Sequence, residues 1–459
     1  RGFNTAGDTS TIFTSAGVEA QGRAGNIRIE TDRLLLDDGA IVSANTSGSG
    51  DGGDITVTAQ TVELRGISSQ FSGFRTIVTT QVTPGASGNA GNITINTDRL
   101  LLDDGAFIAA NTFGTGNGGD LTIRATESVE LRGESIDPNP MAQQNSSVST
   151  NAQAVGNAGD ITIETGVLTL RDGAQFEARS SGVMGRSGNL NVTVDRLELF
   201  DGGRLAVSAT GQNPAGTLNI DADRILLSDG AILEADTEFG TEGNIRLNTN
   251  SLILRDRSRI RTNATEEATG GNITIDTGIL AALENSDITA NSEREAGGNI
   301  VIETRGIFGT QFRTSLSPNS DITATGATQE LQGTVQVNTP DIDATSGLLN
   351  LPADTVDVTR LVGTDPCSEG EGSEFTIIGR GGLPPTPSDP LGGNAAIEWM
   401  DWIDLEIEDT EERKGSQLPI DDPVFREATT WTIAPDGTVS LRLAVPTRSS
   451  LSPQNCWRS

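Results

Sequence analysis

Aliphatic and polar residues alternate along most of this chain in short segments that recur at a nearly constant spacing. Each repeat opens on a glycine, and two aliphatic residues then flank one polar residue, as in Ile161-Thr162-Ile163. A period of two with β-branched residues on one side is typical of a strand with one buried face. We therefore predict a short strand at each such pair: Ile27/Ile29, Ile55/Val57, Ile93/Ile95, Leu121/Ile123, Ile161/Ile163, Leu190/Val192, Leu218/Ile220, Ile245/Leu247, Ile273/Ile275 and Ile300/Ile302.

Two further segments follow in each repeat. A second aliphatic pair, such as Leu100/Leu102, ends at a turn pair such as Asp104-Gly105. A third segment, such as 106–110, alternates small and large residues, and a Gly-rich stretch then leads into the next copy. The repeat therefore predicts three short strands joined by corners.

The spacing of the opening glycines defines the repeat. Successive intervals are 28, 38, 28, 40, 29, 28, 27, 28 and 27 residues. The two long intervals predict loop insertions near 68–85 and 134–155. Because loops on a rigid scaffold often carry recognition, Phe71, Phe74 and Arg75 in the first insertion are candidate interaction residues. Both insertions fall at equivalent points two repeats apart, so we expect them to project from the same face.

The repeat predicts an all-β protein. No helix-length segment lies between the strands, which excludes βαβ units, and the corners are too irregular for tight hairpins at every turn. A right-handed parallel β-helix fits, with three short strands per coil of about 28 residues and about a dozen coils over residues 1–361, ending in a cap near 333–361. The alternative is a series of antiparallel β-sandwiches.

The composition changes in the C-terminal part. We expect a Cys/Pro/Gly-rich linker over 362–393 and a small Trp-containing segment over 394–459, in which 430–443 forms two short strands. Cys367 and Cys456 bracket this region, and an exported protein would allow them to form a structural disulfide. Two unpaired thiols are the alternative.

The composition also narrows the possible functions. The chain has 55 glycines, 4% aromatic residues, no histidine and a formal net charge of −32. The absence of histidine excludes Ser-His-Asp catalysis and histidine metal ligands. Nucleic acids and anionic membranes attract basic patches, so such an acidic chain argues against both as partners. No apolar run of about 18 residues is present, so the sequence predicts no transmembrane helix.

Carboxylates are plentiful but repetitive. Asp38, Asp104, Asp172 and Asp229 occupy the same turn position in different repeats. A catalytic pair is normally unique, so we interpret them as turn formers and assign no catalytic residue and no cofactor. Outward Asp and Asn residues leave weak calcium binding open, although the Gly-rich corners lack the nonapeptide of calcium-loaded β-rolls.

One stretch of the predicted rod concentrates positive charge. Arg259 and Arg261 would both point outward from a third strand. A sulfated or acidic glycan could dock there, which makes these two arginines candidate interaction residues. The alternative is ion pairing with Asp256 and neighbouring Glu residues.

Several stretches resemble one family. The sequence GNITINTDRLLLDDGAFIAANTFGTGNGG at 91–119 resembles the repeat of filamentous-haemagglutinin-like exoproteins, the secreted partners of two-partner secretion, in the form common in cyanobacteria. The stretches at 320–326, 333–357 and 379–387, together with Cys367, resemble the C-terminal region of the same family.

The resemblance implies a right-handed β-helix exported through a dedicated outer-membrane transporter of the TpsB type. The product would be displayed on the cell surface or released as an adhesin-like fibre. The secretion domain of this family is N-terminal, and the chain opens at Arg1 without Met. We therefore expect this sequence to be part of a longer protein.

These observations predict an extracellular structural or adhesin-like protein that is not an enzyme and that presents loops to surface glycans or other cells. The alternative is a β-helical protein that binds or cleaves polysaccharides. Cleavage would need one non-repeating cleft with clustered carboxylates and aromatic residues.

Overall fold

A computed structural model describes residues 10–66, 74–135, 144–182, 184–210, 214–239 and 243–339, and the backbone of 430–433 and 439–442. The chain divides into two units, Arg1–Ser346 and Gly347–Ser459. The described part is all-β, apart from one 3-10 turn at Gln329–Leu331. It contains no helix long and apolar enough to cross a membrane.

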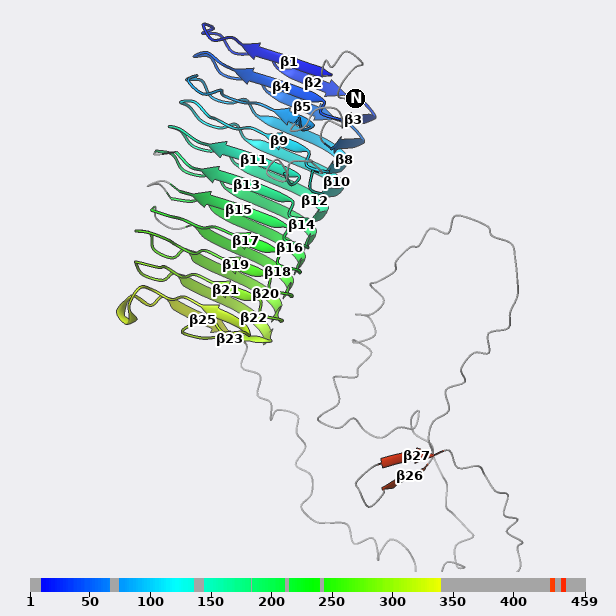
Figure 1. The fold of residues 1–459 in the computed structure, drawn as a ribbon, viewed down its shortest axis with the longest axis vertical. Helices are drawn as coiled ribbons and strands as arrows, with labels where there is room; N and C mark the ends of the chain where they lie inside the picture. Colours follow the sequence, from blue (N-terminus) through cyan, green and yellow to red (C-terminus); the bar gives the residue numbers. More distant parts are fainter. Residues whose placement is uncertain are drawn as a thin grey trace, which may run out of the picture. The chain divides into compact units, whose positions relative to one another are not determined.

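The first unit is a parallel β-helix (Figure 1), as the repeat predicts. Its named strands form two sheets, and every pairing within both sheets is parallel. The described coils make about ten turns, slightly fewer than the dozen expected. At about 4.8 Å per coil, ten turns give a rod of about 48 Å.

The first sheet contains the third segments of the coils. In spatial order its strands are β1 (Thr11–Ala16), β4 (Ile41–Thr46), β7 (Ile77–Thr79), β9 (Phe107–Ala109), β11 (Ser147–Ala152), β13 (Gln175–Ser180), β15 (Arg204–Ala209), β17 (Ile232–Glu234), β19 (Arg259–Arg261), β21 (Asp287–Thr289), β24 (Ser320–Thr323) and β23 (Thr310–Phe312).

The second sheet contains the first and second segments. Its strands are β2 (Ile27–Glu30), β5 (Ile55–Thr58), β8 (Ile93–Asp103), β10 (Leu121–Leu131), β12 (Ile161–Leu170), β14 (Leu190–Leu199), β16 (Thr217–Leu227), β18 (Asn244–Leu254), β20 (Asn272–Ala282), β22 (Asn299–Phe308) and β25 (Thr334–Asn338). In the first two coils the second segments are separate strands, β3 (Arg33–Asp37) and β6 (Thr61–Arg65).

From β8 onward the first two segments join into one long strand, whereas the sequence predicted two. The buried residues of β8 are Ile93, Ile95 and Thr97, and then Leu100 and Leu102. Buried residues are two apart along a straight strand, so the step of three residues from Thr97 to Leu100 marks a bend. The backbone hydrogen bonds to the neighbouring coils continue through this bend. We call this bend the first corner, and the Asp-Gly turn before the third segment the second corner.

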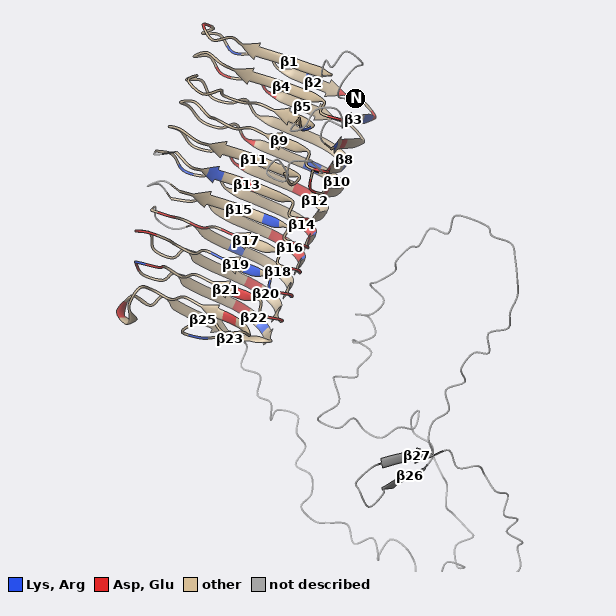
Figure 2. Cartoon of the chain, in the orientation of Figure 1, with Lys and Arg blue, Asp and Glu red and all other residues tan. Residues whose placement is uncertain are grey.

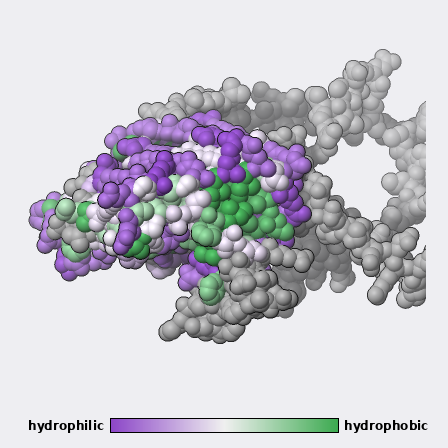
Figure 3. Space-filling view, turned by 90° about the horizontal axis from the view of Figure 1, so that it is seen from above, coloured by the Kyte–Doolittle hydropathy of each residue, from purple (hydrophilic) through white to green (hydrophobic). Residues whose placement is uncertain are grey.

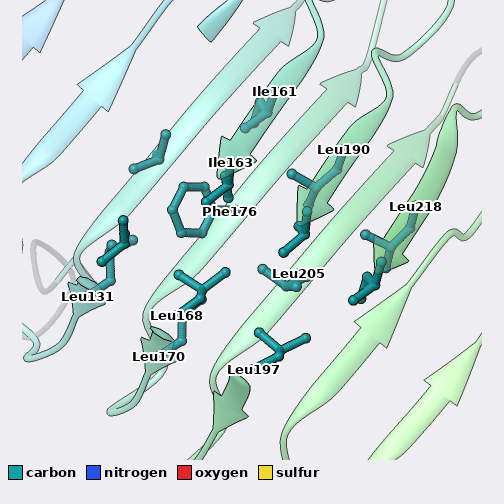
Figure 4. Packing of buried hydrophobic residues seen from close by; sticks show 14 of the residues in the cluster. Leu131, Ile161, Ile163, Leu168, Leu170, Phe176, Leu190, Leu197, Leu205 and Leu218 are labelled. Carbon is teal, nitrogen blue, oxygen red and sulfur yellow. The ribbon is translucent and has the colours of Figure 1, made fainter. Parts of the chain in front are cut away.

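The aliphatic pairs stack on their equivalents as predicted. Ile27 pairs in register with Ile55, and Ile55 with Ile93. Figure 4 shows the middle of this core, where Ile163 and Phe176 point toward one another from β12 and β13; both side chains are fully buried. Full burial of one such aliphatic side chain contributes roughly 1.5–3 kcal/mol, so the columns are the main source of stability.

The opening glycines allow close approach between coils. A Cβ on Gly159 would lie 2.0 Å from the carbonyl oxygen of Gly119 in the preceding coil. Any side chain there would push the coils apart, which explains why a glycine marks each repeat.

Asparagine and aspartate side chains link one coil to the next outside the core. The Oδ1 atom of Asp54 accepts the backbone N–H of Asn92 at 2.9 Å, and Asn92 Oδ1 accepts that of Asp120 at 2.8 Å. A second column repeats this through Asn89 and Asn117. The sequence alone left weak calcium binding by such oxygens open. In the ladders one side-chain oxygen of each of these residues accepts a backbone N–H group.

The second corners contain the aspartates interpreted as turn formers. Asp104 has φ 52° and Gly105 has φ 83°, and the same pair of positive φ angles recurs at Asp38-Gly39, Asp172-Gly173, Asp201-Gly202 and Asp229-Gly230. Aspartate and glycine tolerate this left-handed region best. The recurring geometry supports a structural role for these aspartates.

Arg257 occupies the glycine position of one second corner, with φ 64°. A side chain in this region costs roughly 1–2 kcal/mol per residue. We therefore expect Arg257→Gly to stabilise the rod by about 1 kcal/mol, measured as a higher urea midpoint. Arg259→Gly, in the neighbouring strand β19, is the control and should destabilise it. An unchanged or lower midpoint for Arg257→Gly would contradict this account.

The insertions are shorter than predicted. The first leaves the rod between Gly66 and Thr76, whose backbones bond at 3.1 Å, and the second between Glu134 and Asn145. The strands β7 and β11 lie inside the ranges assigned to the insertions. These two strands could not be recognised from the third-segment pattern, because buried hydroxyl residues such as Thr76 replace its alanines.

Apolar side chains are exposed at both ends of the described rod. Figure 3 shows an apolar area on the end that carries the first coils, where Ile12 is 50% and Phe13 66% exposed. At the other end Phe308 and Phe312 are exposed. β25 continues the second sheet at the start of the expected cap, and the rest of the cap lies outside the described residues.

Of the second unit, the structure describes one antiparallel pair, β26 (Thr430–Ile433) and β27 (Val439–Arg442). This confirms the two short strands predicted at 430–443. The linker over 362–393, Cys367 and Cys456 lie outside the described residues, so the disulfide stays a prediction.

Candidate functional site

A groove lined mainly by polar residues follows the first corner along six coils. It has a volume of about 1030 Å³, and a second groove of about 650 Å³ occupies the same corner in later coils. Two outward columns line the larger groove. The first column contains Glu30, Thr58, Asn96, Arg124 and Glu164. The second contains Asp32, Gln60, Asp98, Thr126 and Asp195. We call this the corner groove.

The periodic corner is interrupted once, near the middle of the groove. Ala125 pairs with Thr97, but Ser128 pairs with Arg99, so Thr126 and Glu127 together face the single residue Asp98. Strand β10 thus carries one extra residue, a β-bulge. Bulges often lie next to functional sites because they re-aim side chains. Here the bulge places the Thr126 hydroxyl 2.7 Å from Asp98 Oδ1.

The next coil accommodates the bulge with a glycine. A Cβ on Gly166 would lie 2.9 Å from the Glu127 carbonyl oxygen, which is too close. A larger residue at this position would therefore clash with the backbone of the bulge. Because glycine has no side chain, it also leaves the groove unfilled at this point.

The bulge also leaves a hydroxyl unused. In regular corners the inward threonine bonds a carbonyl of the preceding coil, as Thr97 does with Gln60 at 2.9 Å and Thr249 with Asp223 at 3.1 Å. The equivalent hydroxyl of Thr165 is buried and has no hydrogen-bond partner within the described part of the chain. A buried polar group of this kind costs about 1–3 kcal/mol.

Acidic side chains dominate the corner groove. Arg124 is the one basic residue along it, and its guanidinium pairs with Glu164 at 3.1 Å. No aromatic residue is part of the lining. In the described residues no three carboxylates or thiols converge in a way that could hold a metal ion. The groove can therefore offer hydrogen bonds and negative charge to a ligand.

The two arginines predicted as interaction residues differ in their surroundings. Arg259 is exposed, whereas Arg261 pairs with Glu234 at 2.5 Å and with Asp236 at 3.0 Å. Arg204 contacts Glu234 from the other side. Figure 2 shows opposite charges alternating from coil to coil here. The four residues Arg204, Glu234, Asp236 and Arg261 form a charged cluster on the outer face of the first sheet.

The charged cluster favours the ion-pair interpretation for Arg261. Glu234 is only 3% exposed, and the pairing partners are Glu234 and Asp236 instead of the expected Asp256. Arg255, nearby, pairs with Glu284 at 3.2 Å. The cationic patch is thus largely neutralised by the rod itself.

Burial and the neighbouring Glu234 raise the pKa of Asp236 to about 7, although Arg261 and the Asn263 backbone N–H oppose the shift. A carboxyl whose pKa is raised on folding loses stability as the pH increases from its unfolded value, near 4, to about 7. Asparagine occupies the same ladder position in the next coils, where Asn263 bonds the backbone of Asn291.

Replacing Asp236 by Asn should therefore remove a pH dependence. We expect wild type to be roughly 2 kcal/mol less stable at pH 8 than at pH 5 through this group, and Asp236→Asn to reduce that difference. Melting temperatures across the pH range measure it. Asp276→Asn changes an exposed carboxyl and should leave the profile as it is. An identical profile for both variants would contradict the prediction.

The side chain of Arg75 makes its contacts within the rod. Its guanidinium donates to the carbonyl oxygens of Gly105 at 2.6 Å and Asn145 at 2.8 Å, and lies 4.7 Å from the centre of the Phe107 ring. Burial lowers the pKa of this guanidinium to about 10. Arg75 thus links the bases of both insertions. Phe74 beside it is 49% exposed, and Phe71 lies outside the described residues.

The structure brings the bases of the two insertions together but leaves them several coils away from Arg259 and Arg261. Sequence reasoning missed the corner groove and its bulge. The sequence did contain a signal for the bulge. Six positions separate the buried residues Ile123 and Val129 across this corner, whereas five separate the equivalent residues Ile95 and Leu100 in the preceding coil. Glu234 had a weaker signal, as an acidic residue one repeat before Arg261 at the equivalent third-segment position.

No protein-family model, curated protein or solved structure matches this chain.

Proposed function

We propose that this chain is a structural, adhesin-like exoprotein without catalytic activity, secreted or displayed at the cell surface as a rigid rod. The observation that carries the proposal is the continuous column of aliphatic residues that stack in register from Ile27 to Val335. Such a scaffold holds surface features at fixed spacing and gains stiffness from every added coil. The resemblance to two-partner secretion exoproteins supports export through an outer-membrane transporter.

The insertions are the proposed attachment elements. Both leave the second corner, at positions where the intervening coil makes the short turn Asp104-Gly105. Their bases are joined through Arg75, which bonds Gly105 and Asn145. The two loops therefore start side by side on one edge of the rod, where one partner could contact both.

Shortening both insertions to the Asp-Gly turn of the intervening coil should strongly reduce attachment of the protein to cells. Circular dichroism and melting should still report a folded rod, because the second corner closes without an insertion in most coils. Variants that shorten one insertion each are the controls and should retain part of the attachment. Unchanged attachment of the double variant would refute the role of the loops.

The rival function is polysaccharide cleavage. Incubation of the purified chain with a panel of polysaccharides and measurement of new reducing ends tests it directly. Release of reducing ends would contradict the non-catalytic proposal. The β-bulge in the corner groove favours a non-catalytic form of the rival function, binding of a polysaccharide.

A further inference from the structure

The corner groove has the form of a site for a long, repetitive ligand. It runs across six coils, from Glu30 to Asp195, and stays open to solvent along its length. Small residues such as Ala59, Ala125 and Gly166 form part of its lining. A compact small molecule would contact one or two coils, whereas an extended chain would contact all six.

The spacing of polar groups matches such a ligand. Equivalent side chains in neighbouring coils are about 4.8 Å apart, which is comparable to the length of one sugar unit in an extended polysaccharide. Asn96, Thr58 and Gln60 offer both donors and acceptors. Hydroxyl groups at regular intervals along a glycan could therefore meet an equivalent side chain in each coil.

The charge of the groove restricts the class of glycan. Glu30, Asp32, Asp98, Glu164 and Asp195 line it against one arginine, which Glu164 already neutralises. Uronate, sulfated and nucleic-acid chains would be repelled. Neutral sugars would bind through hydroxyls, and amino sugars with protonated amines would gain from the carboxylates.

The bulge supplies the one place along the groove that is not repeated. It exposes Thr126, follows directly after the Arg124–Glu164 ion pair, and leaves the Thr165 hydroxyl without a partner in the part of the rod that is described. A glycan hydroxyl could bond the exposed hydroxyl of Thr126, which can accept as well as donate. Binding would then be anchored at this coil and extended in both directions.

We propose that the corner groove is a binding site for an extended polysaccharide of neutral or amine-bearing sugars, centred on the bulge at Thr126. This is a second attachment surface, independent of the insertions. Because aromatic stacking is lacking, each sugar contributes little, and affinity should increase with the number of coils that the ligand spans.

The test uses the full chain and oligosaccharides of defined length in calorimetry. The probes are β-1,4-linked glucose, glucosamine and galacturonate oligomers with two to eight units. We expect affinity for glucose or glucosamine oligomers to increase at least tenfold from two units to about six and then to level off. Galacturonate should not bind. Added salt should weaken the glucosamine series only. Absence of binding in both expected series, or binding of galacturonate alone, would overturn the proposal.

A matched pair of variants locates the site. Thr126→Trp fills the groove at the bulge and should reduce the affinity for the six-unit glucose or glucosamine oligomer at least tenfold. Thr122→Trp places the same side chain on the outer face of the same strand, away from the groove lining, and should bind like wild type. Equal binding by both variants would show that the ligand lies elsewhere. The variant with both insertions shortened should still bind these oligomers. A failure of the groove proposal and a failure of the loop proposal are therefore separate results.

Discussion

Replacing Ile163 by Asp is expected to prevent the middle of the rod from folding. Ile163 is fully buried and stacks between Ile123 and Val192 in the neighbouring coils. The substitution removes aliphatic contacts and places a carboxyl in a dry core, for a cost of about 5 kcal/mol or more. Limited proteolysis and a melting curve that has lost its cooperative transition would record the effect.

The effect of Ile163→Asp should also depend on pH. Burial raises the pKa of the new carboxyl in the folded state above its unfolded value, so the variant loses further stability as the pH increases above about 4. Thr162→Asp, one residue earlier on the outward face of the same strand, is the control and should melt close to wild type. Soluble Ile163→Asp protein with wild-type melting would show that the core register is incorrect.

Removing the carboxylate of Glu234 is expected to cause the second-largest loss of stability. The Glu234 side chain is 4% exposed and is held by Arg204 and Arg261 from the two adjacent coils. Breaking a buried pair by removing one partner leaves uncompensated charge and costs about 3–5 kcal/mol. Glu234→Ala should therefore lower the urea midpoint markedly.

Glu177 provides the matched control. It occupies the same outward position of the first sheet two coils earlier, since Glu177 pairs with Ala206 and Ala206 with Glu234. It has no ion-pair partner among the described residues. Glu177→Ala should change stability by less than about 1 kcal/mol. If both variants lose equal stability, the cluster contributes nothing beyond side-chain packing.

The repeat made the core of this fold predictable. A glycine followed by an alternating aliphatic pair specifies a strand, its buried face and its register at once, because each residue stacks on its equivalent in the next coil. Ile27, Ile55 and Ile93 lie in one column for this reason. The structural role of the aspartates at the second corners was also predictable, because a residue that recurs at the same turn position in many coils is better explained by the turn than by a single active site.

The features outside the repeat were harder to predict. β7 and β11 were missed because Thr76 and Ser146 take the place of alanine, and their buried hydroxyls bond to the carbonyl groups of Arg65 and Arg132. The corner groove is a property of the stack, since its wall comes from single residues about one repeat apart. The contacts of Arg75 cross coils as well, so its sequence neighbours gave no indication of them.

The glycine column and the coil-to-coil ladders have a consequence for a protein under tension. A coil of 28 residues, such as the one that separates Asn89 from Asn117, adds only about 4.8 Å to the length of the rod. If the terminal coil peels away, the same residues extend to about 95 Å. A tether pulled from one end could therefore lengthen stepwise, each step breaking the bonds of a single coil and limiting the force passed to whatever it holds.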